Sequence, residues 1–215
     1  MINVLYEDNH IIVVEKKVGV LSQGDATKDK DLLTMVKEYV KGKYHKPGNV
    51  YIGLVHRLDR MVGGIMVFAR TSKAASRLSE DIRTGLFHKE YIAIVNGKID
   101  KSGTFKDKIK RLDNGNSIIS DDGAEAILNY EVLDYIEGNS LVKINLITGR
   151  HHQIRVQFAS RGHAILGDHR YSDTTDNLPL ALYAYKLEFT HPVKKVPMKF
   201  ELYPVNIGYF KKCHF

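Results

Sequence analysis

The amino-acid sequence predicts an α+β protein with a mixed, largely antiparallel β-sheet. Two observations carry this prediction. Many short segments are apolar runs or alternate apolar and polar residues, as strands do, and turn residues join them in hairpin order. Only a few segments show the three- and four-residue apolar spacing of an amphipathic helix. Strands in hairpin order with a few helices are typical of this class.

The first half of the chain predicts two strands and two helices, over residues 11–17, 31–41, 65–69 and 72–84. Gly19 ends the first strand, "IIVVEKK". In the first helix Leu32, Val36 and Val40 recur at helical spacing, with charged residues between them. Gly85 is placed to end the second helix.

The second half predicts more strands and one more helix. "EYIAIV" (90–95) reads as a strand, and the polar stretch 100–124 as hairpins or a mobile basic loop. Residues 129–136 and 140–147 form a strand pair around Glu137-Gly138-Asn139. A helix is expected over 151–161. "LYAYKLEFT" and "MKFELYP" flank a turn as a last hairpin.

Length, charge and cysteine content indicate how many domains the protein has, what kind of partner it binds and in which compartment it acts. The 215 residues suit a single domain over 1–215, and the formal net charge of +7 favours a polyanionic partner such as RNA, DNA or an anionic membrane surface. The lone Cys213 excludes an intramolecular disulfide and suits a reducing compartment. No apolar run approaches the roughly 20 residues that cross a bilayer. We expect a cytoplasmic protein without a membrane segment.

The stretch "HRLDR", residues 56–60, sets one carboxylate among cationic and proton-bearing groups. Nearby guanidinium groups favour the charged form of Asp59, which could then act as a nucleophile or base. A solvated surface turn explains the same residues. The apolar runs on both sides place the turn at the mouth of a core and weaken this alternative somewhat, but the stretch alone is more typical of a charged turn than of a site.

A second stretch, "KEYIAIVNG" (89–97), places Tyr91 on one face of a strand. Such a tyrosine is most often a core residue with its hydroxyl satisfied at the sheet edge. The functional alternative is a ring that stacks on a nucleobase and a phenol that handles a proton.

A third stretch, "TGRHHQIRVQFASRG" (148–162), combines basic residues with a helix. His151, Arg155 and Phe158 share one face of the expected helix. An arginine on a partly apolar face needs an anion, either a protein carboxylate or a phosphate. Arg150, near the helix start, is a candidate phosphate contact.

Other chemistries lack their motifs. Adjacent His151 and His152 cannot act as paired ligands on one helix face, and no HExxH or CxxC spacing occurs, so no metal site is expected. The sequence also lacks a GxxxxGK[ST] phosphate loop, a GxGxxG turn and a GxSxG elbow.

Together the three stretches resemble the RluA-like family of RNA pseudouridine synthases. The family pattern runs "KP.G", "HRLDR.TSG....A", "K.Y.A.V.G", "TGR.HQIRVH", "G.PI.GD..Y" and "L.A..L.F.HP". This chain has "KKVG", "HRLDRMVGGIMVFA", "KEYIAIVNG", "TGRHHQIRVQ", "GHAILGDHRY" and "LYAYKLEFTHP" in the same order. The agreement in order and spacing extends over nearly the whole chain.

The resemblance implies a function and a set of roles. The family converts a uridine in RNA to pseudouridine without a metal or organic cofactor, in a cleft between sheet, helices and loops. Asp59 matches the catalytic aspartate, Arg57 the arginine that replaces the target base, Tyr91 the tyrosine packed on the uracil, and Arg155 the arginine paired with the aspartate. Further RNA contacts are expected from His56, Arg60, Arg150 and Gln153. Ribosomal RNA and transfer RNA are both open as substrates, and a monomer without a protein partner is expected.

The chain departs from this pattern next to the aspartate. Val62-Gly63-Gly64 stands where the family has "TSG", so two hydroxyls are lost and the loop is expected to be more mobile or to bond differently. The pattern begins by about residue 5, so no S4-type RNA-binding module is expected, and the basic stretch 101–111 is the candidate RNA grip.

Two other functions fit parts of the sequence. A non-catalytic RNA-binding relative would not require Asp59, Tyr91 and Arg155 together. A carboxylate glycosidase would need a second acid, for which Asp168 is the only tempting candidate.

Overall fold

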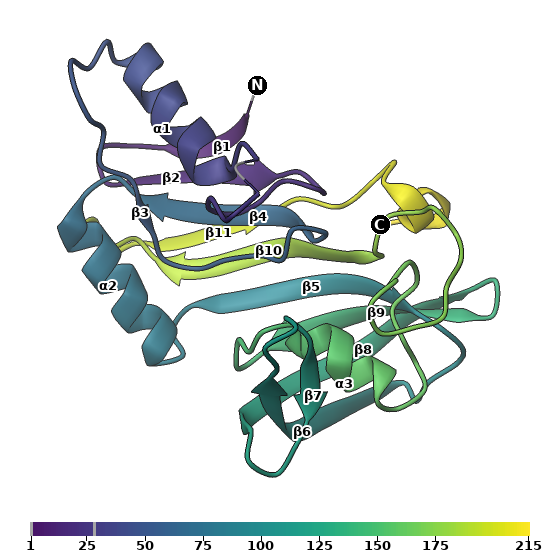
Figure 1. Ribbon diagram of the computed structural model, residues 1–215. Helices are drawn as coiled ribbons and strands as arrows, with labels where there is room; N and C mark the ends of the chain where they lie inside the picture. The colour runs from purple at the N-terminus through teal and green to yellow at the C-terminus, as the bar shows by residue number, and fades with distance from the viewer. Residues whose placement is uncertain (1, 28) are drawn as a thin grey trace. The chain divides into compact units, whose positions relative to one another are not determined.

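The computed structural model describes residues 2–27 and 29–215 and confirms the α+β class with largely antiparallel pairing (Figure 1). The chain forms two compact units. Unit 1 comprises residues 1–88 and 186–202, and unit 2 comprises residues 89–185 and 203–215. Within the described residues, no helix is long and apolar enough to cross a membrane.

Unit 1 is built on antiparallel strands with two helices. Its strands are β1 (Asn3–Glu7), β2 (Ile11–Lys16), β3 (Gly53–Leu54), β4 (Gly63–Ala69), the end of β10 (Leu182–Thr190) and β11 (Pro197–Glu201). β2 lies between β1 and β4, with Lys16 opposite Gly64, and β11 pairs with β10. The apolar runs predicted over 11–17 and 65–69 are therefore neighbours in the sheet.

The two helices of unit 1 begin where the sequence supplies a cap. Asp31 accepts a hydrogen bond from the backbone N–H of Thr34 at the start of α1 (Leu32–Lys43), and Thr71 does the same for Ala74 in α2 (Ser72–Arg83). Both predicted helices are confirmed to within a few residues.

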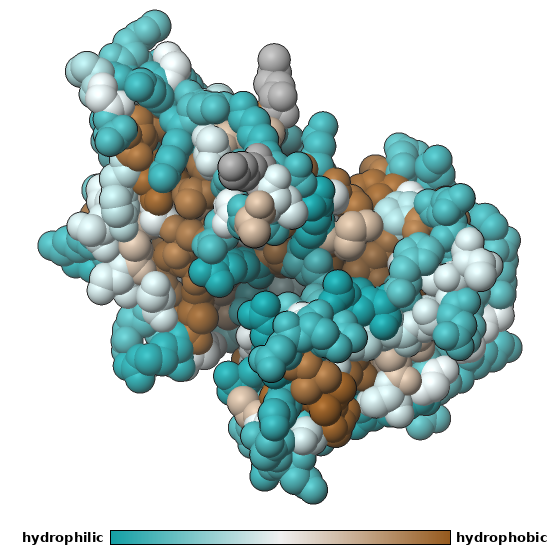
Figure 2. Space-filling view, in the orientation of Figure 1, coloured by the Kyte–Doolittle hydropathy of each residue, from teal (hydrophilic) through white to brown (hydrophobic). Residues whose placement is uncertain are grey.

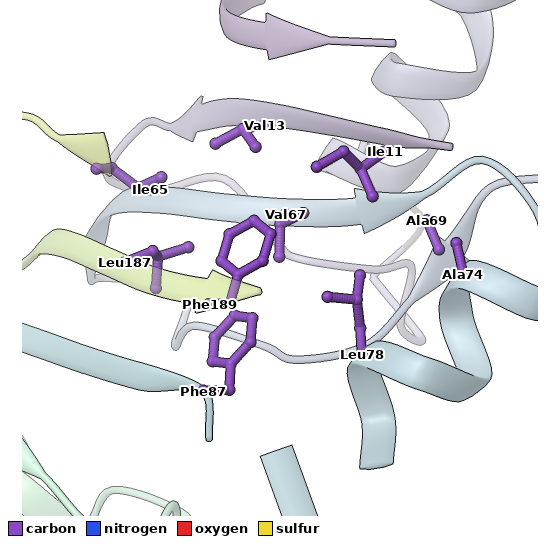
Figure 3. Packing of buried hydrophobic residues seen from close by; sticks show 10 residues of the cluster. All are labelled: Ile11, Val13, Ile65, Val67, Ala69, Ala74, Leu78, Phe87, Leu187 and Phe189. Atoms are coloured by element: carbon purple, nitrogen blue, oxygen red, sulfur yellow. The ribbon is translucent and has the colours of Figure 1, made fainter. Parts of the chain in front are cut away.

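The core of unit 1 is a hydrophobic cluster between its sheet and α2 (Figure 3). Ile11 and Val67 contribute from β2 and β4, and Leu78 contributes from α2. Phe87 and Phe189 stack with ring centroids 5.2 Å apart. Burial of such aliphatic and aromatic side chains is the main favourable term in folding, and it holds the strands that carry the Asp59 stretch.

Unit 2 contains the remaining strands in the order β5-β9-β8-β6-β7. They are β5 (His88–Val95), β6 (Ser102–Arg111), β7 (Ser117–Ile119), β8 (Ala124–Ile136) and β9 (Asn139–Leu146). The predicted β8–β9 hairpin is confirmed, and its turn residues Glu137 and Gly138 both have positive φ. Two positive φ values match the twist of the flanking strands.

In unit 2 one of two alternatives is confirmed and one expectation needs correction. Residues 101–111 form β6, which pairs with both β7 and β8, so the hairpin alternative for 100–124 is confirmed and the mobile loop is not. The helix is shorter than expected, because α3 covers only Gln153–Ala159 and His152 before it has φ +53°. His151 thus lies outside the helix face on which it was placed. Three elements were not predicted at all: β1, the two-residue strand β3 and the 3₁₀ turn η1 (Gly208–Lys212).

Candidate active site

The loop between β3 and β4, residues 55–62, carries four of the sequence-predicted site residues and is called the Asp59 loop. Its centre is anchored by Leu58, which is buried. The Ser22 hydroxyl accepts a hydrogen bond from the Leu58 N–H at 3.0 Å and donates one to the Leu58 carbonyl at 2.7 Å. The residue next to Asp59 is thereby bound to a segment 36 positions earlier in the chain.

The carboxylate of Asp59 is oriented by its own turn. Its Oδ1 accepts a hydrogen bond from the backbone N–H of Met61 at 3.1 Å, and its carbonyl accepts one from Val62 at 3.0 Å. This is the side-chain-to-backbone turn that aspartate favours. Asp59 is partly exposed, so the oriented carboxylate remains accessible.

Lys16 stabilises the Asp59 loop through hydrogen bonds to its backbone, a role that the sequence did not predict. Its side chain is 0% exposed, and its ammonium donates to the carbonyls of Lys17, Arg60 and Val62 at 3.2, 3.0 and 2.8 Å. Burial lowers the pKa of Lys16 to about 8, against the opposing attraction of Asp59. Lys16 is the first lysine of the stretch "KKVG", to which the sequence assigned no role.

The other three sequence-predicted residues of this loop differ in their surroundings. Nε2 of His56 accepts the Val67 N–H at 3.1 Å, so His56 ties the loop to β4. The Arg60 guanidinium bonds the Gly19 carbonyl and pairs with Asp29 at 2.7 Å. Arg57 is exposed and makes no hydrogen bond or ion pair within the described parts of the chain. Of these three side chains, the planar cation of Arg57 is therefore the most available for a ligand.

Tyr91 lies on β5 in unit 2, opposite Ile144 of β9. Its side chain is buried, and burial raises its pKa above the ordinary tyrosine range. The phenol is therefore protonated at neutral pH. Among residues 2–27 and 29–215 no group hydrogen-bonds its hydroxyl. A buried tyrosine ring usually finds a partner for its hydroxyl, so this arrangement favours the functional interpretation of Tyr91.

Gln153 shapes the turn of residues 148–150 instead of facing solvent. Its Oε1 accepts hydrogen bonds from the Thr148 hydroxyl at 2.8 Å and the Arg150 N–H at 3.0 Å, and its Nε2 donates to the Ile127 carbonyl at 3.1 Å. The side chain is 2% exposed. We therefore revise its predicted RNA contact to a structural role. Arg150 is exposed, and its Nε donates to the Glu125 carbonyl at 2.8 Å.

Arg155, on α3, forms a buried ion pair with Asp168. Its Nε and Nη2 donate to the two carboxylate oxygens at 2.9 and 2.7 Å. The two side chains are only 7% and 0% exposed. Asp168 Oδ1 also accepts the backbone N–H of Arg170 and Tyr171. In the sequence analysis Asp168 was a candidate only for the second acid of a glycosidase. In the structure Asp168 anchors Arg155.

A second group of contacts surrounds this ion pair. The Tyr171 ring lies 5.1 Å from the Arg155 guanidinium. Its hydroxyl bonds Nδ1 of His152 at 2.8 Å and accepts the Ser117 N–H at 2.8 Å. The Ser117 hydroxyl in turn donates to the His151 carbonyl. The two histidines therefore help to join α3 to the β6–β7 hairpin, which no sequence pattern had indicated.

The predicted site residues thus divide between the units. His56, Arg57, Asp59 and Arg60 lie together on one loop of unit 1, and Arg150 and Gln153 lie together on one turn of unit 2. Tyr91 and Arg155 occupy a strand and a helix of unit 2. The described residues include no group of three or more His, Cys, Asp or Glu placed to hold a metal ion.

A cavity of about 370 Å³ lies between the β6–β7 hairpin and α3. Ile118, Val156 and Tyr171 contribute to its lining. Figure 2 shows a hydrophobic patch in the region where Figure 1 places β7 and α3, and Ile118 and Ile119 are exposed there. Its lining is largely apolar and, among the described residues, contains no carboxylate, imidazole or basic side chain.

Comparison with known proteins identifies the family of this chain and several related proteins. Residues 10–160 match the family model described as RNA pseudouridylate synthase. This range includes Asp59, Tyr91 and Arg155. The chain is 33% identical over 216 residues to ribosomal large subunit pseudouridine synthase D of Xylella fastidiosa, covering 92% of this chain and 64% of the relative. It is 34% identical to an uncharacterized RNA pseudouridine synthase of Aquifex aeolicus, covering 94% of this chain and 69% of the relative.

A solved structure shows the same fold. The human protein RNA Pseudouridylate Synthase Domain Containing 4 superposes with a TM-score of 0.75 at 25% identity, over 97% of this chain and 89% of that one. The chain spans about two thirds of the length of the curated relative from Xylella fastidiosa.

Proposed function

Because the chain belongs to the RNA pseudouridylate synthase family, we propose that it isomerises a uridine in RNA to pseudouridine. The observation that carries this proposal is the Asp59 loop, in which a partly exposed carboxylate is oriented by its own turn above a buried ammonium. A loop that only joined two strands would not require a buried cation.

The reaction breaks the C–N glycosidic bond, rotates the uracil and forms a C–C bond to the same sugar. No electrons enter or leave, so an organic redox group is not needed. In our proposal Asp59 either attacks the sugar or the uracil or removes a sugar proton. Each of these routes requires its ionised form.

The remaining roles follow from position and chemistry. The target uridine must leave its base stack, which costs a few kcal/mol, and the exposed planar cation of Arg57 is suited to fill the gap. The ring of Tyr91 packs on the uracil, and its protonated phenol donates a hydrogen bond. For Arg155 we keep the role implied by the resemblance, which is to favour the ionised carboxylate of Asp59. Asp168 holds Arg155 in one orientation for that role.

For the substrate we propose ribosomal RNA of the large subunit before transfer RNA, because the curated relative from Xylella fastidiosa carries that name. The exposed Lys106 and Lys108 of β6 are candidate contacts to the RNA backbone. We further propose that the protein acts in the cytoplasm as a monomer. Light scattering on the purified protein tests the monomer.

Release of tritium tests the reaction itself. RNA carrying tritium at uracil C5 releases it when pseudouridine forms, because C5 becomes the carbon bonded to the sugar. We expect release from large-subunit RNA, with transfer RNA tested in a parallel reaction. A non-catalytic RNA-binding protein would release none, and a glycosidase would yield free uracil. Either result on both RNAs would reject the proposed function.

A further inference from the structure

The face of β5 that carries Tyr91 also carries Lys89. Side chains two residues apart in a strand point to the same side of the sheet, so Lys89 and Tyr91 are neighbours on one face. Glu90, between them, points to the other face, where the hydroxyl of Tyr185 donates to its carboxylate at 2.7 Å. The nearest acidic residue in sequence is therefore directed away from Lys89.

The ammonium of Lys89 lies against the turn of residues 148–150. A Cβ atom placed on Gly149 would lie 3.4 Å from Nζ, which shows that the ammonium lies close to this turn. Lys89 is half-buried, and burial lowers its pKa. In the part of the chain that the structure describes, no group hydrogen-bonds or ion-pairs with this ammonium.

Two other lysines with reduced exposure each have partners. The buried Lys16 donates three hydrogen bonds to carbonyls. Lys143, on the neighbouring strand β9, pairs with Glu131 at 2.6 Å. A cation that loses water without gaining a partner is costly to the folded protein, so a retained one indicates an anion supplied from outside.

We propose that Lys89 binds a backbone phosphate of the RNA beside the nucleotide that stacks on Tyr91. An ammonium is a compact point charge suited to a single phosphate oxygen. The exposed Arg150 adds a second positive charge on the same turn. This inference rests on the proposed function, because it places the phosphate relative to the uridine on Tyr91.

The test is the salt dependence of RNA binding by Lys89→Met. Fluorescence anisotropy with a short labelled single-stranded oligoribonucleotide gives the affinity over a range of KCl concentrations. We expect the slope of log affinity against log salt to fall by about 0.7, which is the loss of one phosphate contact on a single strand. Lys89→Arg should keep the slope, and Lys143→Met is the matched control that should leave it unchanged.

A wild-type slope in Lys89→Met would overturn the phosphate contact. If kcat also fell in that variant, Lys89 would act on the base instead of on a phosphate. Urea unfolding excludes a folding defect, because removal of an unpartnered cation should leave stability equal or higher. Binding does not require turnover, so a changed slope in a protein that releases no tritium would reject the proposed reaction and keep the phosphate contact.

Discussion

Lys16 and Lys89 are both withdrawn from water, and their surroundings differ in one respect. Lys16 gives all three of its ammonium hydrogens to backbone carbonyls, two of which lie in the Asp59 loop. Lys89 gives none within the described residues. The same side chain therefore holds the fold in the first case and is available to a ligand in the second. At this scale, hydrogen-bond partners separate structural from functional residues better than residue type.

Asp59→Asn should reduce tritium release by about 10³-fold or more, because an amide can act neither as nucleophile nor as base. The amide oxygen can still accept the Met61 N–H, so the turn should persist. We expect RNA affinity by anisotropy within about twofold of the wild type, since no phosphate contact is lost. Retained turnover in this variant would exclude Asp59 as the reacting group.

Lys16 should give stability a specific pH dependence. Its pKa is about 8 in the folded protein and 10.5 when unperturbed. Between these values the unfolded chain binds more protons, so the free energy of unfolding rises with pH, and below pH 8 the contribution is constant. Relative to Lys16→Met, the wild type should gain up to about 3 kcal/mol across this window in urea unfolding. A difference that does not vary with pH would contradict the assigned pKa.

Elements that carry site residues are held by bonds to distant segments. Helix α3 has only seven residues and no side-chain cap at its start, so it has little stability of its own. Its Val156 packs with Ile109 and Ala126 of the sheet. The Arg155–Asp168 pair and the Tyr171 contacts fasten it further. The helix is therefore a product of tertiary packing.

Asp168→Ala should lower the free energy of unfolding by about 3 kcal/mol, because it leaves the buried guanidinium of Arg155 without its carboxylate. Chemical denaturation measures the loss. Glu80→Ala is the matched control, since it removes one partner of the surface pair with Arg83 and should cost under about 1 kcal/mol. Equal effects of the two substitutions would mean that the buried pair does not anchor α3.

Val62-Gly63-Gly64, where the chain departs from the family pattern, joins the Asp59 loop to strand β4. The backbone at Gly64 is unusual. Gly64 has φ +134°, which L side chains rarely adopt, and pairs with Lys16. Gly64→Ala should therefore cost about 1 kcal/mol or more in thermal or urea unfolding. Gly42→Ala in α1 is the control. It has open space around the added methyl group and should be neutral or stabilising. Equal stabilities of the two variants would contradict the assigned strain.

At the scale of the whole molecule, the net charge of +7 is the property that bears on function. Many of the acidic groups are engaged within the protein, as in the pairs of Asp168 with Arg155 and of Glu131 with Lys143. RNA would be attracted mainly through its phosphates, with release of counterions.

RNA affinity should accordingly fall at least about tenfold between roughly 50 and 200 mM KCl. Anisotropy titrations with large-subunit RNA fragments and with transfer RNA measure this fall. The non-specific part of the affinity should be equally salt-sensitive for both RNAs. Affinity that does not depend on salt would mean that the positive charge has no part in binding.

Much of this protein was predictable because its signals are local. Apolar runs, strand alternation and helical spacing of apolar residues predicted β2, β4, β5, α1 and α2, and the ordered motifs predicted the family. Over residues 100–124 the sequence left hairpins and a mobile loop both open, because β6 alternates exposed lysines with inward residues in a weak pattern. The predicted length of α3 was also wrong, since the left-handed backbone of His152 places the start of the helix at Gln153.

The sequence by itself determined the class of the fold, the family and the choice of Asp59, Tyr91 and Arg155, since these depend on residue type and order along the chain. Only the tertiary structure decided that Lys16 supports the Asp59 loop, that Asp168 anchors Arg155 and that Gln153 shapes a turn. The physical reason is that each of these roles depends on a hydrogen bond or ion pair between groups whose proximity the fold creates, up to 46 positions apart for Lys16 and Val62. Local sequence patterns do not indicate which distant residues will become such partners.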